Sequence, residues 1–354
     1  MMILSIFFIF LCLISLIVFH EFGHFIFAKI FKVKVEEFGI FLPPPILKKK
    51  IGETTFSLNL LPLGAFVKLY GEREIKKEKG SFSNLPIFKR ILIVLGGVIS
   101  FWIIASILTS IVLSLGVPTV IPDEKEVFGA TVQIVQVFPN SPASFSKLMP
   151  GDEILEAAGK KIDKVSQLQE ITKENLGKEM VLKIKRGKEV LEVSLIPRVS
   201  PPKDQGPIGI SIVRTQIKKY SILEAIIKGP ILVFDITLGI LKGYFQAIKN
   251  AILRRPTGIS LTGPVGVSYL LWQASKAGRI YFLNLLSMIS IYLAIFNLLP
   301  IPALDGGKLL FLLIEAMRKK PISPKVEERI TTFFFALLLL LLLFVTISDI
   351  KRIF

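Results

Sequence analysis

The chain has 354 residues, of which 52% are hydrophobic, and its mean hydropathy of +0.63 is high for a soluble globular protein. Its net charge of +17 could indicate a nucleic-acid surface, but the basic residues crowd into 32–90 and the short loop Met317–Lys320. Short loops on one side of a membrane protein carry such an excess of lysine and arginine, so we expect a lipid bilayer as partner and no nucleic acid. The single cysteine, Cys12, excludes disulfides and a cysteine-based metal site.

Four charge-free runs are long enough to cross a bilayer, which takes about 20 apolar residues. The sequence therefore predicts a polytopic α-helical membrane protein with four transmembrane helices, within segments 1–31, 89–116, 280–304 and 330–354. The first run could be a cleaved signal peptide, but no basic residue precedes it and no small-residue cleavage site follows it, so we interpret it as a retained helix. The loop charges predict that both termini and the long segment between helices two and three lie outside the cytoplasm.

Residues 32–88 are predicted to form a cytoplasmic or re-entrant β-region. Thr55, Ser57 and Asn59 alternate with apolar residues, which is the period of a strand, and the upstream run KVKVEEFGI supplies a partner strand. The run LPPPILKKK between them is expected to be a rigid connector, because proline lacks a backbone donor. The pattern leaves two interpretations open, a membrane-associated hairpin or sheet and a solvated cytoplasmic hairpin.

Residues 117–200 turn hydrophilic and predict a separate small domain. They contain the strand ATVQIVQV, a short helix around Gln167–Glu174, and a hairpin with its turn at Arg186–Gly187. The motif NSPA, followed by PGDEIL and then by a helix and a hairpin, resembles a PDZ domain.

Residues 201–279 are predicted to be a proline-rich linker followed by an amphipathic helix at the membrane interface, interrupted near Pro230. Five charged residues of this helix share one stripe, namely Glu224, Lys228, Asp235, Lys242 and Lys249. Residues 305–329 are expected to form a cytoplasmic loop or helix.

The stretch HEFGH places two imidazoles and a carboxylate inside the first apolar run. Residues four apart share one face of a helix, so His20 and His24 can offer two nitrogen ligands to one metal ion, with Glu21 beside them as general base. A histidine pair at this spacing can arise by chance, but these are the only two histidines in the chain. Zinc suits such a set, because it accepts nitrogen and oxygen ligands and leaves a position open for water.

A third ligand must be a carboxylate from another helix. Asp305 follows the third span, where Pro300, Pro302 and two glycines break the helix, and Glu315 is the competing candidate. Asp305 could instead serve only as a helix cap, a position that aspartate favours.

These motifs together resemble the site-2 protease family. The resemblance rests on HEFGH, LPLGAFVK, FSNLPIFKRILIVLGG, the PDZ-like module and NLLPIPALDGG, and it covers nearly the whole chain. It implies that His20, His24 and Asp305 bind Zn²⁺ and that Glu21 is the catalytic carboxylate.

The resemblance also implies a substrate-binding region. Asn297 would contact the substrate backbone or the developing oxyanion, and the sheet around Thr54–Leu69 would present an edge strand to the substrate at Gly64 and Phe66. Two departures affect these contacts: the usual LGGY is LGAF here, with Ala65 before Phe66, and the usual GPxxN is GGVIS, with Gly97 and Ser100.

We therefore expect an intramembrane zinc metalloprotease that cuts within or near transmembrane segments of pre-trimmed membrane proteins, such as anti-sigma factors or signal-peptide remnants. The expected place is the bacterial inner membrane, with the active site towards the cytoplasm and an extracytoplasmic PDZ domain that binds peptide termini. One alternative is a catalytically inactive docking protein built around the PDZ domain. Another is a transporter, because intramembrane ionisable residues also mark ion pathways.

Overall fold

The computed structural model describes residues 2–202, 205–257 and 261–353. The chain forms two compact units, which are described separately below. The first contains Met1–Ile107, Pro230–Tyr269 and Ser287–Phe354, and the second contains Leu108–Gly229 and Leu270–Leu286.

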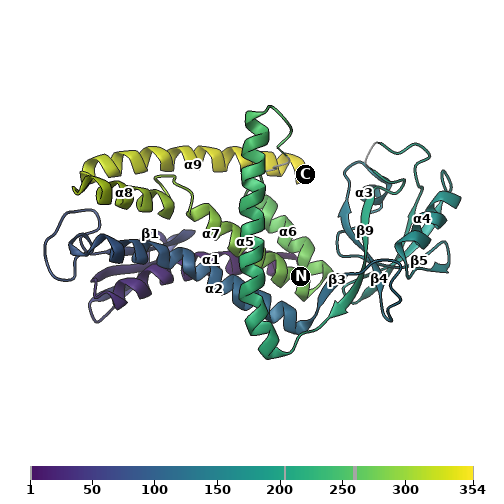
Figure 1. Cartoon of the computed structure of the whole chain (residues 1–354), viewed down its shortest axis with the longest axis horizontal. Helices are drawn as coiled ribbons and strands as arrows, with labels where there is room; N and C mark the ends of the chain where they lie inside the picture. Colours follow the sequence, from purple (N-terminus) through teal and green to yellow (C-terminus); the bar gives the residue numbers. More distant parts are fainter. Residues whose placement is uncertain (1, 203–204, 258–260, 354) are drawn as a thin grey trace. The chain divides into compact units, whose positions relative to one another are not determined.

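Four helices in the described ranges are long and apolar enough to cross a membrane (Figure 1). They are α1 (Met2–Ile30), α2 (Ile87–Leu115), α7 (Arg279–Asn297) and α9 (Pro324–Ile353). This agrees with the expected membrane protein. Only 6% of the apolar window of α9 is buried, so its leucine and phenylalanine side chains are available to lipid.

The third span ends earlier than expected. Helix α7 stops at Asn297, not at Leu304, because Pro300 and Pro302 cannot continue the backbone hydrogen bonds of a helix. A short helix, α8 (Asp305–Arg318), then begins at Asp305.

Helices α1 and α2 cross at a contact between glycines. A Cβ on Gly23 would lie 2.2 Å from the carbonyl oxygen of Gly96, so the two backbones touch where side chains are absent. Small residues allow such close approach between membrane helices, where van der Waals packing replaces the hydrophobic effect.

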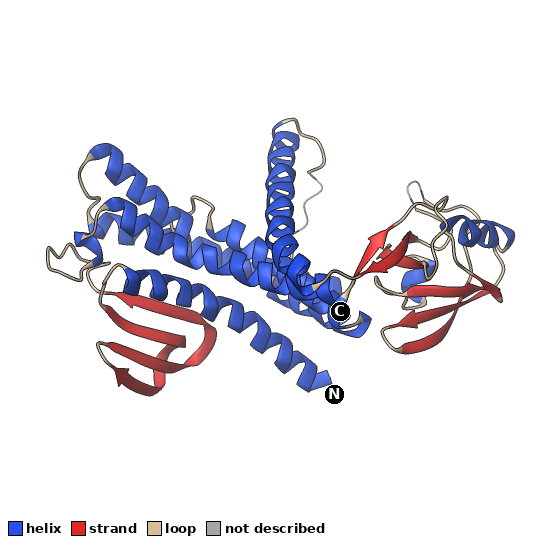
Figure 2. Cartoon of the chain, turned by 60° about the horizontal axis from the view of Figure 1, so that its bottom comes forward, coloured by secondary structure: helices blue, strands red, loops and turns tan. Residues whose placement is uncertain are grey.

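Strands β1 (Val35–Ile51) and β2 (Thr54–Leu69) form a small sheet beside α1 (Figure 2). Both strands bend, so the first half of β1 lies between two parts of β2. It pairs with residues 65–69 on one side and with residues 55–58 on the other side. The second half of β1 pairs with 54–59 and forms the outer edge. The expectation that LPPPILKKK is only a connector is therefore wrong: its prolines lie at the bend, and Leu47–Lys50 belong to the strand.

A short 3-10 helix, η1 (Phe82–Asn84), follows the sheet and precedes α2. Phe82 and Val35 join Ala28 of α1 and Ile93 of α2 in one buried apolar cluster. This cluster fixes the sheet against the membrane helices.

The second unit is built around an antiparallel sheet. Its strands are β3 (Val117–Val120), β4 (Thr131–Val137), β5 (Glu153–Ala157), β6 (Lys160–Lys161), β7 (Met180–Arg186), β8 (Glu189–Leu195) and β9 (Ile210–Lys218). The sheet order is β3-β9-β4-β5-β7-β8, with β6 paired to β5, and the helices α3 (Pro142–Phe145) and α4 (Val165–Glu174) lie between strands in the sequence. Its buried core includes Val132, Ile154 and Leu182.

The limits of this unit differ from the expected ones. Strand β9 pairs with both β3 and β4, so the sheet continues to Lys218, beyond the expected end of the module at residue 200. The hairpin turn lies at Gly187–Lys188, one residue later than expected. The sequence missed β9 because a proline-rich stretch separates it from the other strands.

Two helices connect the sheet module to α7. Helix α5 (Ile222–Ile252) runs without interruption through Pro230, contrary to the expected break, since a proline removes only one backbone donor and the turns on both sides remain intact. Helix α6 (Pro264–Ala277) lies in the range that was expected to be linker and interfacial helix.

Replacing Gly23 with alanine should destabilise the α1–α2 contact, because the added Cβ would overlap the carbonyl of Gly96. We expect a loss of roughly 1–3 kcal/mol in unfolding free energy, typical of overpacking. The measurement is the midpoint of thermal unfolding in detergent with a metal chelator present. Gly239→Ala in α5 is the matched control, since nothing lies within 4 Å of its Cβ position. Equal midpoints for the two variants would contradict the glycine contact.

Candidate metal centre

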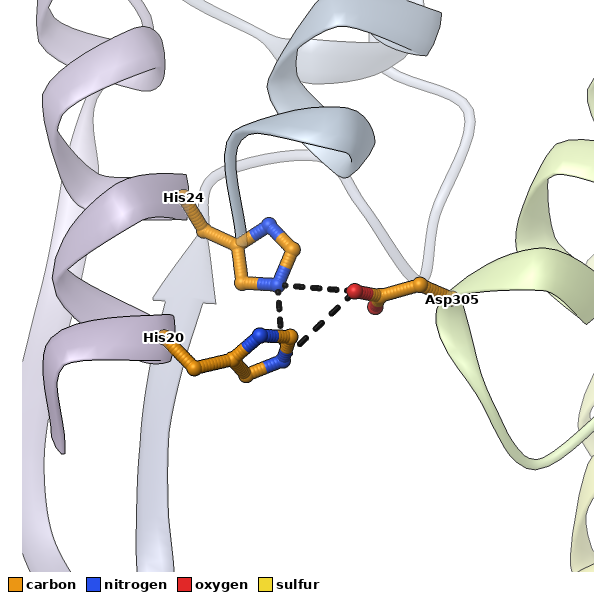
Figure 3. Close-up of side chains that lie close together, drawn as sticks. All are labelled: His20, His24 and Asp305. Atoms are coloured by element: carbon orange, nitrogen blue, oxygen red, sulfur yellow. Dashed lines mark hydrogen bonds and ion pairs between the residues drawn. The ribbon is translucent and has the colours of Figure 1, made fainter. Parts of the chain in front are cut away.

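His20 and His24 lie one helical turn apart on α1 and face the same side (Figure 3). Their Nε2 atoms are 3.3 Å apart. His20 is 7% exposed and its ring stacks on Phe101 of α2 with 4.7 Å between ring centroids. The helix and the aromatic ring therefore fix the first imidazole.

Asp305 is brought to the histidines by the first turn of α8. A Cβ added to Gly306 would lie 2.2 Å from the carbonyl oxygen of Leu299. A Cβ added to Gly307 would lie 2.3 Å from the carbonyl oxygen of Ile301. Only glycines allow the helix to start so close to the preceding turn. The helix cap is Leu304, so the alternative that Asp305 merely caps α8 is wrong.

The three side chains form a nearly equilateral triangle of donor atoms. Asp305 Oδ2 lies 3.5 Å from His20 Nε2 and 3.3 Å from His24 Nε2. Tetrahedral zinc with donors about 2.0–2.2 Å away separates adjacent donors by roughly 3.3–3.6 Å. The triangle therefore fits such an ion and leaves a fourth position for a reactant. These are the three residues, among those described, that can hold a metal ion together.

The tautomer of His24 is set by a backbone contact. Its Nδ1 lies 2.9 Å from the carbonyl oxygen of Ile93, which can only accept a hydrogen bond, so the proton resides on Nδ1. The unprotonated Nε2 then points its lone pair at the triangle, as a metal ligand requires. His20 Nδ1 is buried without a hydrogen-bond partner, and so is Asp305 Oδ2.

Gly97 of α2 is a site residue whose role the sequence pattern did not reveal. A Cβ there would lie 2.3 Å from His24 Nε2 and 2.6 Å from His20 Cε1, so the glycine leaves room for both rings. The hydroxyl of Ser100 donates to the carbonyl of Gly97 within α2, at 2.7 Å. The structure therefore accounts for both departures in GGVIS. Gly97 lies against the two imidazoles, and Ser100 bonds to the backbone of its own helix.

Glu315 does not join the triangle. Its two carboxylate oxygens accept hydrogen bonds from Arg90 of α2, at 2.5 Å and 3.0 Å, in a largely buried bidentate pair. The pair lines the same cavity as the triangle. Glu315 therefore neutralises a buried arginine, and Asp305 is the carboxylate next to the histidines.

A cavity of about 880 Å³ surrounds the triangle. Glu21, Phe66 and Asn297 line it, whereas Gly64 is not among its lining residues. Phe66, Val67 and Leu69 of the edge strand 65–69 line this cavity together with Glu21, so the candidate base and this strand face the same space.

Two of the expected substrate contacts have internal partners. The Asn297 amide donates to the carbonyl oxygen of Leu293 in its own helix, at 2.9 Å. The ring of Phe66 lies over Gly39 on the neighbouring strand, where it covers backbone that glycine leaves bare.

A charged cluster that the sequence did not predict lies in the same cavity. Lys308, one turn after Asp305, places its Nζ 2.7 Å from Glu327 of α9 and 3.8 Å from Glu72 in the loop after β2. The sequence gave no sign of this cluster, because Glu72 and Glu327 lie in segments far from Lys308 in the chain.

The comparisons with known proteins agree with this chemistry. The model of peptidase family M50 matches residues 8–341. A protein named as a zinc metalloprotease in Clostridium perfringens is 33% identical over 95% of this chain and 95% of its own. One so named in Campylobacter jejuni is 32% identical over 96% of this chain and 91% of its own. The regulator of sigma-W protease RasP of Bacillus subtilis is 27% identical over 96% of both chains. The chain therefore belongs to peptidase family M50 and is an intramembrane zinc metalloprotease of the site-2 type.

Proposed function

We propose that His20, His24 and Asp305 hold the zinc ion and that Glu21 is the general base. The observation that carries this assignment is the triangle of donor atoms, whose sides of 3.3–3.5 Å match tetrahedral zinc. The docking-protein alternative is not favoured, since a docking protein needs neither this geometry nor a carboxylate beside it. When bound, zinc supplies a Lewis acid that activates water and polarises the scissile carbonyl.

The side chains of the cavity carry the proton transfers. Glu21 takes a proton from the attacking water and passes it to the amine of the leaving peptide. Asn297 uses its second amide hydrogen to stabilise the negative charge that develops on the carbonyl oxygen.

The edge strand 65–69 receives the substrate. A transmembrane helix hides its peptide bonds in internal hydrogen bonds, so it must unwind before hydrolysis. Pairing with an open sheet edge replaces those lost bonds, a mode known as β-augmentation. Residues 65–69 pair with β1 on one side only, and Phe66 and Val67 line the cavity, which supports this role.

The substrates are membrane proteins, and we propose that they are trimmed before they reach the site. We assign the protein to the bacterial inner membrane, with the cavity towards the cytoplasm. The excess of lysine and arginine in residues 32–90 and in the loop Met317–Lys320 favours that orientation. RasP is named as a regulator of sigma-W protease, and an analogous role in regulated proteolysis of anti-sigma factors or of signal-peptide remnants is proposed here.

The sheet module acts as a PDZ-like filter in this proposal. Strand β9 is covered by β3 only along Thr215–Lys218, which leaves Ile210–Val213 without a strand on that side within the described chain. Helix α4 packs beside β9. An open strand edge next to a helix is the arrangement that PDZ domains use for peptide termini.

The Glu21→Gln variant tests the general base. We expect zinc to remain bound at one equivalent, because the triangle is intact, while cleavage of a single-span substrate falls by roughly 10²–10⁴-fold. Zinc is measured by elemental analysis of detergent-purified protein and cleavage by gel. Full activity in this variant would reject the mechanism and would revive a role in docking or transport.

The Asp305→Ala variant tests the third ligand. Removing one corner of the triangle should abolish stoichiometric zinc binding and therefore cleavage. Glu315→Gln is the matched control, since Glu315 is a carboxylate on the same helix that pairs with Arg90. Zinc retained in Asp305→Ala, or lost equally in both variants, would show that the ligand assignment is wrong.

Deleting the sheet module tests the filter. The carbonyl of Leu113 accepts a hydrogen bond from the backbone N–H of Tyr220 at 3.1 Å, so a short glycine-serine linker can replace Val117–Lys218 without moving the ends. We expect the deleted form to cut intact and trimmed substrates at similar rates, whereas the full chain prefers trimmed ones. The same deletion with Glu21→Gln controls for other proteases. An unchanged preference would reject the filter.

A further inference from the structure

The outer half of the membrane-associated sheet separates apolar from charged residues along its length. At one end, Ile40 pairs with Leu58, which in turn pairs with Leu47. At the other end, Glu37 pairs with Thr55, which pairs with Lys50. The sheet is therefore apolar near its bends and charged near its turn at 52–53.

The apolar end has its polar groups inside and its hydrophobic groups outside. Ser57 and Asn59 are buried, and the Asn59 amide donates to the carbonyls of Ile40 and Phe41. Leu47 and Leu60, by contrast, are 66% and 56% exposed. A strand in water shows the opposite pattern, so this end of the sheet is suited to a hydrocarbon environment.

The charged end carries three consecutive exposed lysines, Lys48–Lys50. Lys48 lies 3.4 Å from Glu37, whereas Lys49 and Lys50 have no ion pair within the described ranges. The lysines directly follow the exposed pair Ile46 and Leu47. A long lysine side chain beside a hydrocarbon-embedded segment extends its ammonium to the level of the lipid headgroups.

We propose that Lys48–Lys50 form a binding surface for anionic phospholipid headgroups. The apolar side chains next to them favour lipid over a soluble acidic partner, because they would remain exposed in a complex with the latter. Opposite charge then selects among the headgroups. This inference requires the sheet to touch lipid, but it does not require the zinc chemistry.

Strand β2 connects the proposed lipid-binding surface to the edge strand 65–69, which is proposed to receive the substrate. Strand β2 begins beside the lysines, at Thr54, and ends with residues 65–69, of which Phe66, Val67 and Leu69 line the cavity. Headgroups held at the outer edge would fix the depth of the whole sheet. They would thereby set which peptide bond of a substrate reaches the metal centre.

The test uses fluorescence quenching in the full-length protein. A fluorophore is attached to Leu47→Cys in a Cys12→Ser background and reconstituted in phosphatidylcholine vesicles. Two quencher lipids carry the same acyl-chain nitroxide, one on phosphatidylglycerol and the other on phosphatidylcholine. We expect phosphatidylglycerol to be enriched at this position by roughly threefold or more. Substituting all three lysines with glutamine should make the two quenchers equal.

The control label is placed at Leu340→Cys on α9, which is 65% exposed in the apolar span and should show no headgroup preference. Equal quenching by both lipids at Leu47, or a preference that survives the triple substitution, would overturn the proposal. Absence of quenching by either lipid at Leu47 would also overturn it. Zinc content and cleavage are measured on the same preparations, so a failure of the protease assignment is recorded separately.

Discussion

The structure depends on the convergence of three lone pairs in a largely apolar interior. His20, His24 and Asp305 place their donor atoms within 3.5 Å of one another, and one of these atoms, the buried Asp305 Oδ2, has no hydrogen-bond partner. Such an arrangement is unfavourable without a positive charge at its centre, since unpaired buried polar groups cost about 1–3 kcal/mol each. A divalent cation at the centre would make the same arrangement favourable, because it attracts all three donor atoms. The other features of the first unit keep these atoms together.

Glycines provide the room for this convergence. Gly23 and Gly96 let α1 and α2 touch, Gly97 makes space for the imidazoles, and Gly306 and Gly307 let α8 begin against the preceding turn. Each lacks a side chain where a Cβ would meet backbone or a ligand ring. The candidate metal centre is thus shaped as much by absent side chains as by His20, His24 and Asp305.

The cavity joins the chemistry to the means of presenting a substrate. Glu21 lines it together with Phe66, Val67 and Leu69 of the edge strand 65–69, so the proposed base and the proposed peptide-binding edge face one space. The Arg90–Glu315 pair and Lys308 with its two carboxylate partners add charge to the same cavity. These groups make this part of the cavity charged, whereas α9 exposes apolar side chains such as Leu340.

The sequence by itself determined the membrane class, the four apolar helices and the histidine pair, because each depends on local hydropathy or on the spacing of residues within one helix. The sequence favoured Asp305 over Glu315 beside the histidines, but only the tertiary structure showed what Glu315 does, since its partner Arg90 lies more than two hundred residues away in the chain. It also decided that LPPPILKKK is a strand and that β9 completes the module, because strand pairing depends on partners that local pattern does not specify. Contacts within one helix follow from its periodicity, whereas contacts between segments depend on how the whole chain packs.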